Sequence, residues 1–124
     1  MTFVCYPKCT TCQKARKWLD ENGISYELRD IKTENPSYEE LEQWYRRGGL
    51  PLKKFFNTSG LLYKSMELKD QLPGMTEGEM LHLLATDGML VKRPLLVGEE
   101  TVLVGFKEAE WAQRLKANEA DTKK

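Results

Sequence analysis

The chain has 124 residues and equal numbers of basic and acidic side chains, 19 of each, so its formal net charge is zero. A chain of this length forms one domain and buries a core without disulfides or metals. Zero net charge excludes electrostatic capture by nucleic acid or an acidic membrane, and no stretch reaches the roughly 18 apolar residues of a transmembrane helix.

The number of cysteines helps to predict the cellular compartment of the protein. Three cysteines are an odd number for a secreted domain held together by disulfides. The N-terminus opens on a predicted strand, without the charged head and apolar run of a secretory signal. We therefore expect a cytoplasmic protein, in which a Cys-x-x-Cys pair is catalytic, regulatory or metal-binding rather than structural.

The first predicted elements are a strand, a helix and a second strand. Residues 2–6 alternate as a strand, and Cys5 on its inner face is expected to be a packed core thiol, with a redox role as the alternative. A helix is predicted over 10–22, ended by Gly23, and residues 24–29 alternate as the second strand. A β-α-β unit of this size implies parallel strands and a right-handed crossover.

The helix begins with the two cysteines of the motif, Cys9 and Cys12. The first N–H groups of a helix lack intrahelical partners and carry partial positive charge, so a thiolate there is stabilised. The pKa of a cysteine at that position falls below its free value of about 8.5. Cys12 lies one turn further on the same face and can reach Cys9, so the pair predicts a nucleophile and a resolving thiol for thiol–disulfide exchange.

Two other interpretations of the pair stay open. A zinc site needs about four ligands, and Cys5 and His82 are the only further candidates, so we expect no metal. Inert buried thiols are the other alternative, because free cysteine packs as a small hydrophobe. The basic residues that follow, Lys14, Arg16 and Lys17, fit a partly exposed electropositive site better.

The middle of the chain is predicted to be helical. Ser37 with Glu40, and Thr76 with Glu79, form capping boxes that each predict the start of a helix. Between these two helices the pattern predicts three shorter elements, namely a helix over 50–56, a turn over 57–60 and a helix over 61–72.

The last part predicts a hairpin and a helix. Residues 95–97 and 101–104 are β-rich and are joined by a glycine-containing turn. An amphipathic helix runs from 107 to about 115, and the polar tail 116–124 is expected to be disordered. The helix is expected to bury Ala109, Trp111 or Ala112, and Leu115.

The order of elements predicts an α/β protein with a mixed sheet. Residues 1–34 and 88–115 form the two halves of a thioredoxin-like fold, arranged as β-α-β and β-β-α. Residues 35–87 are a helical block inserted between these halves within the same domain.

Four segments carry a family resemblance, namely 7–15 (PKCTTCQKA), 57–60 (NTSG), 92–97 (KRPLLV) and 103–106 (LVGF). To about residue 115, the chain resembles the arsenate-reductase-like (ArsC/Spx) branch of the thioredoxin superfamily. A Cys-x-x-Cys alone would be weak evidence for this family. Its combination with an Arg-Pro pair at the start of a later strand makes the match specific.

The resemblance implies roles for three residues. Cys9 is the reactive thiol, and a cis peptide bond before Pro94 packs the strand start against the cysteine loop. Arg93 points at the Cys9 sulfur and holds the thiolate or an oxyanion with its planar fork of donors. Independently of the resemblance, the position of Thr10 and Thr11 at the helix start leads us to expect that their backbone N–H groups bind an anion.

The chain also differs from the glutathione-dependent arsenate reductases of this family, which carry a single active-site cysteine and two further arginines. By rough alignment those two arginines fall near Lys53 and Gly105. Lys53 has a positive charge that can bind an anion but lacks the paired N–H donors of a guanidinium, and Gly105 has no side chain. The Cys-x-x-Cys instead matches the redox switch of the Spx-type transcription regulators, which bind RNA polymerase.

Our leading hypothesis is a monomeric thiol–disulfide oxidoreductase. Cys9 attacks an oxidised sulfur or an oxyanion such as arsenate, and Cys12 resolves the adduct. Glutathione, glutaredoxin or thioredoxin reduces the resulting disulfide, and no metal or organic cofactor is needed. The alternative is a redox-sensing regulator that binds the RNA polymerase α subunit and contacts neither nucleic acid nor membrane. A structural adaptor with vestigial cysteines is the third hypothesis.

Overall fold

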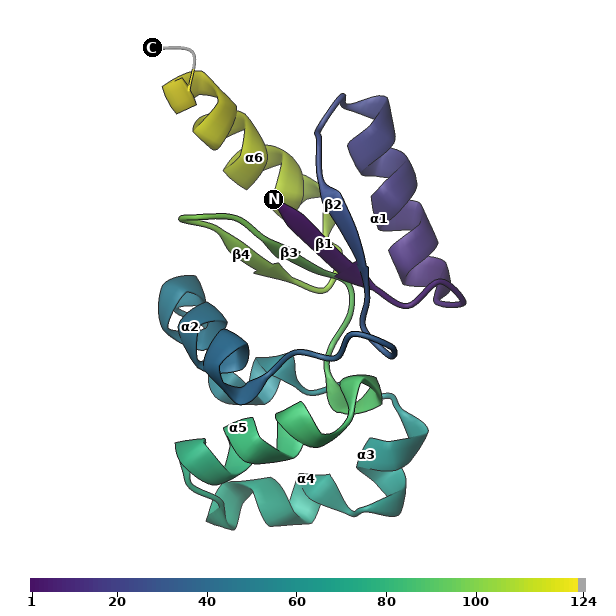
Figure 1. The fold of residues 1–124 in the computed structure, drawn as a ribbon, viewed down its shortest axis with the longest axis vertical. Coiled ribbons are helices and arrows are strands. Elements are labelled where there is room, and N and C mark those ends of the chain that lie inside the picture. The colour runs from purple at the N-terminus through teal and green to yellow at the C-terminus, as the bar shows by residue number, and fades with distance from the viewer. Residues whose placement is uncertain (123–124) are drawn as a thin grey trace.

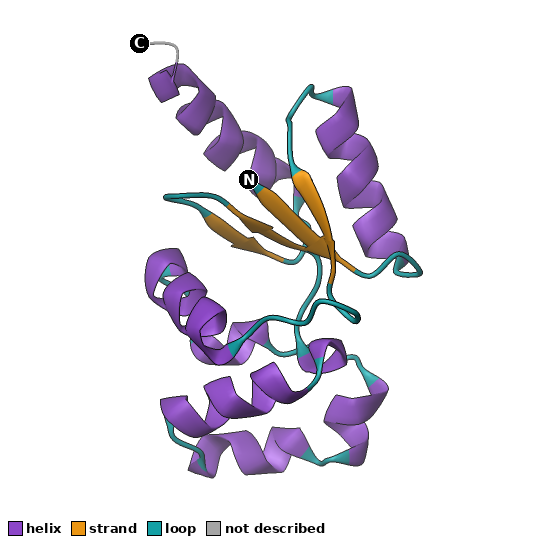
Figure 2. Ribbon diagram, in the orientation of Figure 1, coloured by secondary structure: helices purple, strands orange, loops and turns teal. Residues whose placement is uncertain are grey.

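The computed structural model describes the backbone of residues 1–122 and the side chains of residues 1–115. Its centre is a four-stranded sheet in the order β2-β1-β3-β4 (Figure 2). β1 (Thr2–Cys5) pairs in parallel with β2 (Glu27–Asp30) and antiparallel with β3 (Leu95–Val97), which pairs antiparallel with β4 (Val102–Val104). The predicted mixed sheet and thioredoxin-like α/β fold are confirmed.

One face of the sheet is covered by α1 (Thr10–Glu21) and α6 (Glu108–Thr122) (Figure 1). Side chains alternate along β1, so Phe3 and Cys5 point to this face while Val4 points to the other. The buried residues on the α1 and α6 side are Phe3, Cys5, Cys12, Ala15, Leu19, Leu96, Leu103, Trp111 and Leu115.

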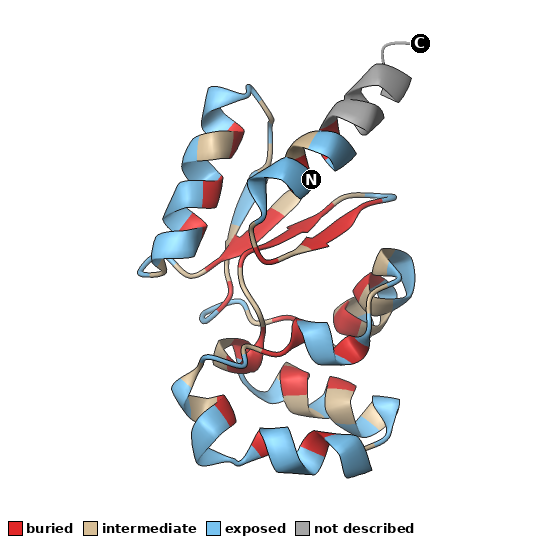
Figure 3. Cartoon of the chain, turned by 180° about the vertical axis from the view of Figure 1, so that it is seen from behind, coloured by how far each residue is buried: buried red, intermediate tan, exposed pale blue. Residues whose placement is uncertain are grey.

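The opposite face packs against the helical segment between β2 and β3. Its two main helices are α2 (Tyr38–Gly48) and α5 (Glu77–Thr86). Short elements connect them to one another and to β3: η1 (Leu52–Phe55), α3 (Leu61–Ser65), α4 (Leu68–Gln71), η2 (Leu72–Gly74) and η3 (Gly88–Leu90). β1, β3 and β4 are mostly buried at the centre, whereas the edge strand β2 is partly exposed, and exposed helix surfaces lie outside them (Figure 3).

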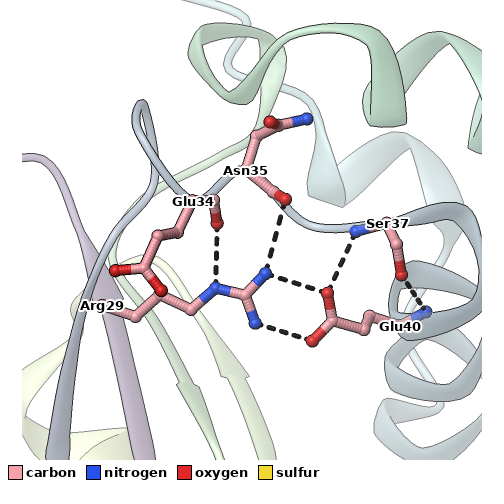
Figure 4. A network of polar contacts seen from close by, with 5 residues as sticks. All are labelled: Arg29, Glu34, Asn35, Ser37 and Glu40. Atoms are coloured by element: carbon pink, nitrogen blue, oxygen red, sulfur yellow. Dashed lines mark hydrogen bonds and ion pairs between the residues drawn. The ribbon is translucent and has the colours of Figure 1, made fainter.

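Both predicted capping boxes are present, and one belongs to a larger network (Figure 4). Arg29 on β2 makes a bidentate ion pair with Glu40, at 2.6 and 2.8 Å, and donates to the carbonyls of Glu34 and Asn35. Glu40 also accepts from the Ser37 N–H at 3.1 Å. The hydrogen bonds from Arg29 lower the pKa of Glu40 to about 2. The network therefore ties the end of β2 to the start of α2.

The boundaries of three predicted elements are corrected. The second strand begins at Glu27 rather than residue 24, because the Glu27 N–H bonds to the carbonyl of Met1 and β1 begins only at Thr2. The helix predicted over 61–72 is broken at Glu67, whose φ of 54° is left-handed. The break lets the chain turn so that side chains on either side of it are buried, a tertiary requirement that overrides helical periodicity. The short helix over 50–56 is a 3₁₀ helix.

The last helix also differs from the prediction. α6 continues to Thr122, so residues 116–122 are helical rather than an irregular tail; residues 123–124 lie outside the described part. The segment contains Lys, Ala and Glu and no Gly or Pro, which favours continuation of a helix. Trp111 and Leu115 are buried as predicted, but Ala109 is exposed. Among residues 1–122, no helix has the length and apolar character to cross a membrane.

Candidate active site

Cys9 occupies the N-cap position of α1, with extended backbone angles of φ −84° and ψ 122°. Its N–H donates to the Tyr6 carbonyl at 2.9 Å, and its carbonyl accepts the first helical bond, from Gln13, at 3.1 Å. The Cys9 side chain makes no capping hydrogen bond, and the first turn holds no acidic residue. The positive end of this helix is therefore available to an anionic sulfur or ligand.

Cys12 lies behind Cys9 and is buried, with 2% of its surface exposed. Its sulfur accepts the Tyr6 N–H at 3.4 Å, and its side chain packs in one cluster with those of Cys5 and Cys9. The hydrogen bond to Cys5 and burial raise the pKa of Cys12 above its ordinary value, whereas the same hydrogen bond lowers the pKa of Cys5. The structure thus brings Cys9 and Cys12 together as predicted and adds Cys5, which was expected to be a packed core thiol.

Cys9 opens into a cavity of about 790 Å³ between the start of α1, the turn before α3 and the ends of β3 and β4. Three cationic side chains line it, namely Lys92, Arg93 and Lys107. The other lining residues are Thr11, Asn57, Ser59, Gly60, Leu61, Leu62, Met89, Val104, Gly105 and Phe106. A thiol beside three cations is suited to react with an anionic substrate.

Two contacts hold Arg93 at the wall of this cavity. Its guanidinium carbon lies 5.3 Å from the centre of the Tyr6 ring, and its Nη1 donates to the Met89 carbonyl at 3.4 Å. The peptide bond between Arg93 and Pro94 is cis, which confirms that expectation. Arg93 and Cys9 line the same cavity, so an anion bound there can meet both.

The remaining predicted site residues do not all line the Cys9 cavity. Thr11 lines the Cys9 cavity, whereas Thr10 is exposed at the first helical position and is not among its lining residues. Lys53 lies in a neighbouring cavity of about 670 Å³ together with Lys54. Lys53 and Cys9 thus line two adjoining cavities, which share Lys92, Val104 and Lys107.

Sequence reasoning missed Lys92 and Lys107, which line both cavities. Lys92 stands next to Arg93 in a segment that carried the family resemblance, so its position was a usable signal. Lys107 had no such signal, because it reaches the site only through the packing of the β4–α6 connection. Within the described residues, no group of three or more His, Cys, Asp or Glu is arranged to hold a metal ion.

Comparisons with known proteins agree with this geometry. The sequence model of the ArsC family matches residues 5–114. The chain is 52% identical over 113 residues to YusI, an uncharacterised protein of Bacillus subtilis, covering 91% of this chain and 96% of YusI. It is 30% identical over 111 residues to the global transcriptional regulator Spx of Enterococcus faecalis, covering 89% of this chain and 82% of Spx.

The fold is likewise similar to that of solved structures. A crystal structure of an ArsC-family-related protein from Bacteroides fragilis superposes with a TM-score of 0.89 at 58% sequence identity. The superposition covers 90% of this chain and 94% of the other. The similarity therefore includes both the sheet and the helical segment inserted between β2 and β3.

Proposed function

The chain belongs to the ArsC family, and on this basis we propose that it is a thiol–disulfide oxidoreductase of the arsenate-reductase-like type. One observation carries the proposal: Cys9 lies at an uncapped helix start, with the buried Cys12 thiol packed beside it in the first turn and a cationic cavity in front of it. This arrangement supplies a nucleophile, a resolving thiol and an anion site.

The proposed reaction proceeds in two exchange steps. The Cys9 thiolate attacks one sulfur of a substrate disulfide, forming a mixed disulfide and releasing the other sulfur as a thiolate. Cys12 then loses its proton and attacks the Cys9 sulfur, which forms a Cys9–Cys12 disulfide and expels the second half of the substrate. The substrate gains two electrons and the cysteine pair loses two, and glutathione, glutaredoxin or thioredoxin returns them.

The residues around the thiols have distinct proposed roles. The N–H groups of Thr10 and Thr11 belong to the helix start that stabilises the thiolate. Arg93 binds an anionic group of the substrate. Pro94 fixes the course of the backbone next to Arg93 at the wall of the Cys9 cavity. A disulfide with carboxylates fits the cavity better than arsenate, because Lys53 lies in the adjacent cavity and Gly105 has no side chain to hold an oxyanion.

A turnover assay tests the proposal. The purified protein is given oxidised glutathione, 2-hydroxyethyl disulfide or arsenate, each with a glutathione–glutaredoxin system and, separately, with a thioredoxin system. We expect turnover with the disulfides, and loss of that turnover in Cys9→Ser. Folded protein that turns over none of the substrates, or turnover that survives Cys9→Ser, would contradict the proposal.

The similarity to Spx favours a second candidate, a redox-sensing regulator that binds the α subunit of RNA polymerase. In that case Cys9 and Cys12 form a switch, and the disulfide changes affinity for the partner rather than completing a catalytic cycle. The purified α subunit is tested for binding to the reduced and to the oxidised protein. Redox-dependent binding without turnover supports the regulator, and turnover without binding supports the enzyme.

A further inference from the structure

The cysteine cluster contains a thiol that the proposed reaction does not use. Cys5 is the last residue of β1 and lies on the sheet face covered by α1, with 5% of its surface exposed. Cys12 projects from α1 onto the same face of the sheet and packs in one cluster with Cys5 and Cys9. The Tyr6 N–H, one residue beyond Cys5, bonds to the Cys12 sulfur and holds it at the end of β1.

Cys5 and Cys12 both line a second cavity, of about 440 Å³, which lies between the start of α1 and the edge strand β2. Its other lining residues are Tyr6, Pro7, Gln13, Arg16, Leu28, Asp30 and Glu34. None of these residues lines the cavity into which Cys9 opens. Cys12 is therefore the one thiol in contact with both of the others, and Cys9 and Cys5 face different cavities.

We propose that Cys5 is a third redox thiol, which takes over the disulfide from Cys9. This inference rests on the proposed function, since it begins from the Cys9–Cys12 disulfide. The Cys5 thiol loses its proton to solvent and attacks the Cys12 sulfur. The Cys5–Cys12 bond forms, the Cys9–Cys12 bond breaks, and Cys9 leaves as a thiolate. One disulfide replaces another, so no further oxidant or reductant is needed.

The direction of this exchange follows from the positions of the three sulfurs. The hydrogen bond that lowers the pKa of Cys5 comes from the Cys12 thiol, which has no proton to donate once Cys12 is in a disulfide. Cys9, in contrast, leaves at the N-terminus of α1, where partial positive charge stabilises a departing thiolate. A more stable leaving thiolate departs faster and favours the disulfide that does not contain it. The product disulfide is enclosed by β1 and α1, and the reactive Cys9 is returned to the cationic cavity.

Peptide mapping distinguishes the two disulfides, because trypsin cleavage after Lys8 and Lys14 leaves Cys9 and Cys12 in one peptide and Cys5 in another. The reduced protein is treated with one equivalent of 2-hydroxyethyl disulfide, quenched in acid, alkylated and digested. A Cys9–Cys12 disulfide lies within peptide 9–14, whereas a Cys5–Cys12 disulfide links peptides 1–8 and 9–14. We expect the linked species, with the alkyl group on Cys9.

Alkylation kinetics supply an independent readout. Iodoacetamide should modify Cys9 in the oxidised wild type at a rate within about two-fold of that in the reduced protein, because Cys9 is no longer in a disulfide. In the matched variant Cys5→Ala, oxidation should give only the disulfide within peptide 9–14, with Cys9 protected. The mapping on the wild type needs no variant, so it holds even if Cys5→Ala fails to fold.

The outcomes separate this inference from the function on which it rests. Wild-type protein that forms only the Cys9–Cys12 disulfide overturns the role of Cys5 and leaves the proposed exchange intact. A protein that forms neither disulfide overturns both. A linked species in which Cys12 rather than Cys9 carries the alkyl group also overturns the proposed transfer.

Discussion

The starts of α1, α2 and α5 use the same two positions in opposite ways. In α2 and α5 the N-cap residue and the residue three positions later form a capping box, Ser37 with Glu40 and Thr76 with Glu79. In α1 those positions are occupied by Cys9 and Cys12.

This substitution explains how the pair can react. In a capping box the side chains at the N-cap and the third position each accept a hydrogen bond from the other residue's backbone N–H, so both lie over the first turn. The same spacing lets two thiols meet, while the absence of a capping side chain and of acidic residues leaves the helix start available to a thiolate. The starts of α2 and α5 are closed by side-chain caps, whereas the start of α1 has none.

Replacing Cys9 tests the comparison most directly. In Cys9→Ser the hydroxyl can cap α1, so stability should hold or rise by about 0.5–1 kcal/mol while kcat/KM for disulfide reduction falls at least about 10³-fold. Urea unfolding and turnover are measured on the same preparation.

As a control, Ser37→Cys places a thiol at the start of α2, where the negative charges of Glu39 and Glu40 destabilise a thiolate. The thiol of this variant at position 37 should react with iodoacetamide more slowly than Cys9 does. Equal rates would contradict the distinction between the helix starts.

Arg93→Ala tests the cationic cavity in front of Cys9. We expect kcat/KM for oxidised glutathione to fall about 10- to 100-fold, because a charge-assisted contact to a carboxylate is lost. The loss for the neutral 2-hydroxyethyl disulfide should be smaller, and Arg93→Lys should restore part of the activity toward the anionic substrate. An equal loss with both substrates would show that Arg93 supports the fold rather than the anion.

Glu40→Gln tests the structural side of the comparison. The pKa of Glu40 is lowered from 4.5 to about 2, so its contribution to stability is complete above about pH 4.5 and is lost as the pH falls through about 2. Glu40 is 38% exposed, and solvent screening limits the expected loss at pH 7 to about 1–2 kcal/mol. Urea unfolding between pH 7 and pH 2 should show the wild type and the variant converging in acid. A constant difference would mean that the Arg29–Glu40 charge pair is not its cause.

Thr11→Glu makes the start of α1 resemble those of α2 and α5. A carboxylate in the first turn should stabilise the helix by about 0.3–0.5 kcal/mol. Because Thr11 lines the Cys9 cavity, the same charge should slow the reaction with oxidised glutathione by about three- to ten-fold. Thr11→Gln is the neutral control of similar size. Slowing by both variants alike would indicate a steric rather than an electrostatic effect.

Much of the fold is encoded in contacts between residues close in sequence. The capping boxes and the Cys9–Cys12 spacing all depend on residues three apart, and the alternation of β1 places Cys5 on its inner face. The sequence alone therefore determined the mixed α/β architecture, the main helix starts and the pair of thiols in the first turn of α1.

Tertiary structure decided the rest, because it depends on segments far apart in the chain. The antiparallel pairing of β3 with β1 brings Lys92 and Arg93 to the start of α1, and the packing of the β4–α6 connection adds Lys107. The break at Glu67 and the contact between Cys5 and Cys12 arise in the same way. Local patterns specify how a helix starts, but the order of strands in the sheet determines which side chains surround it.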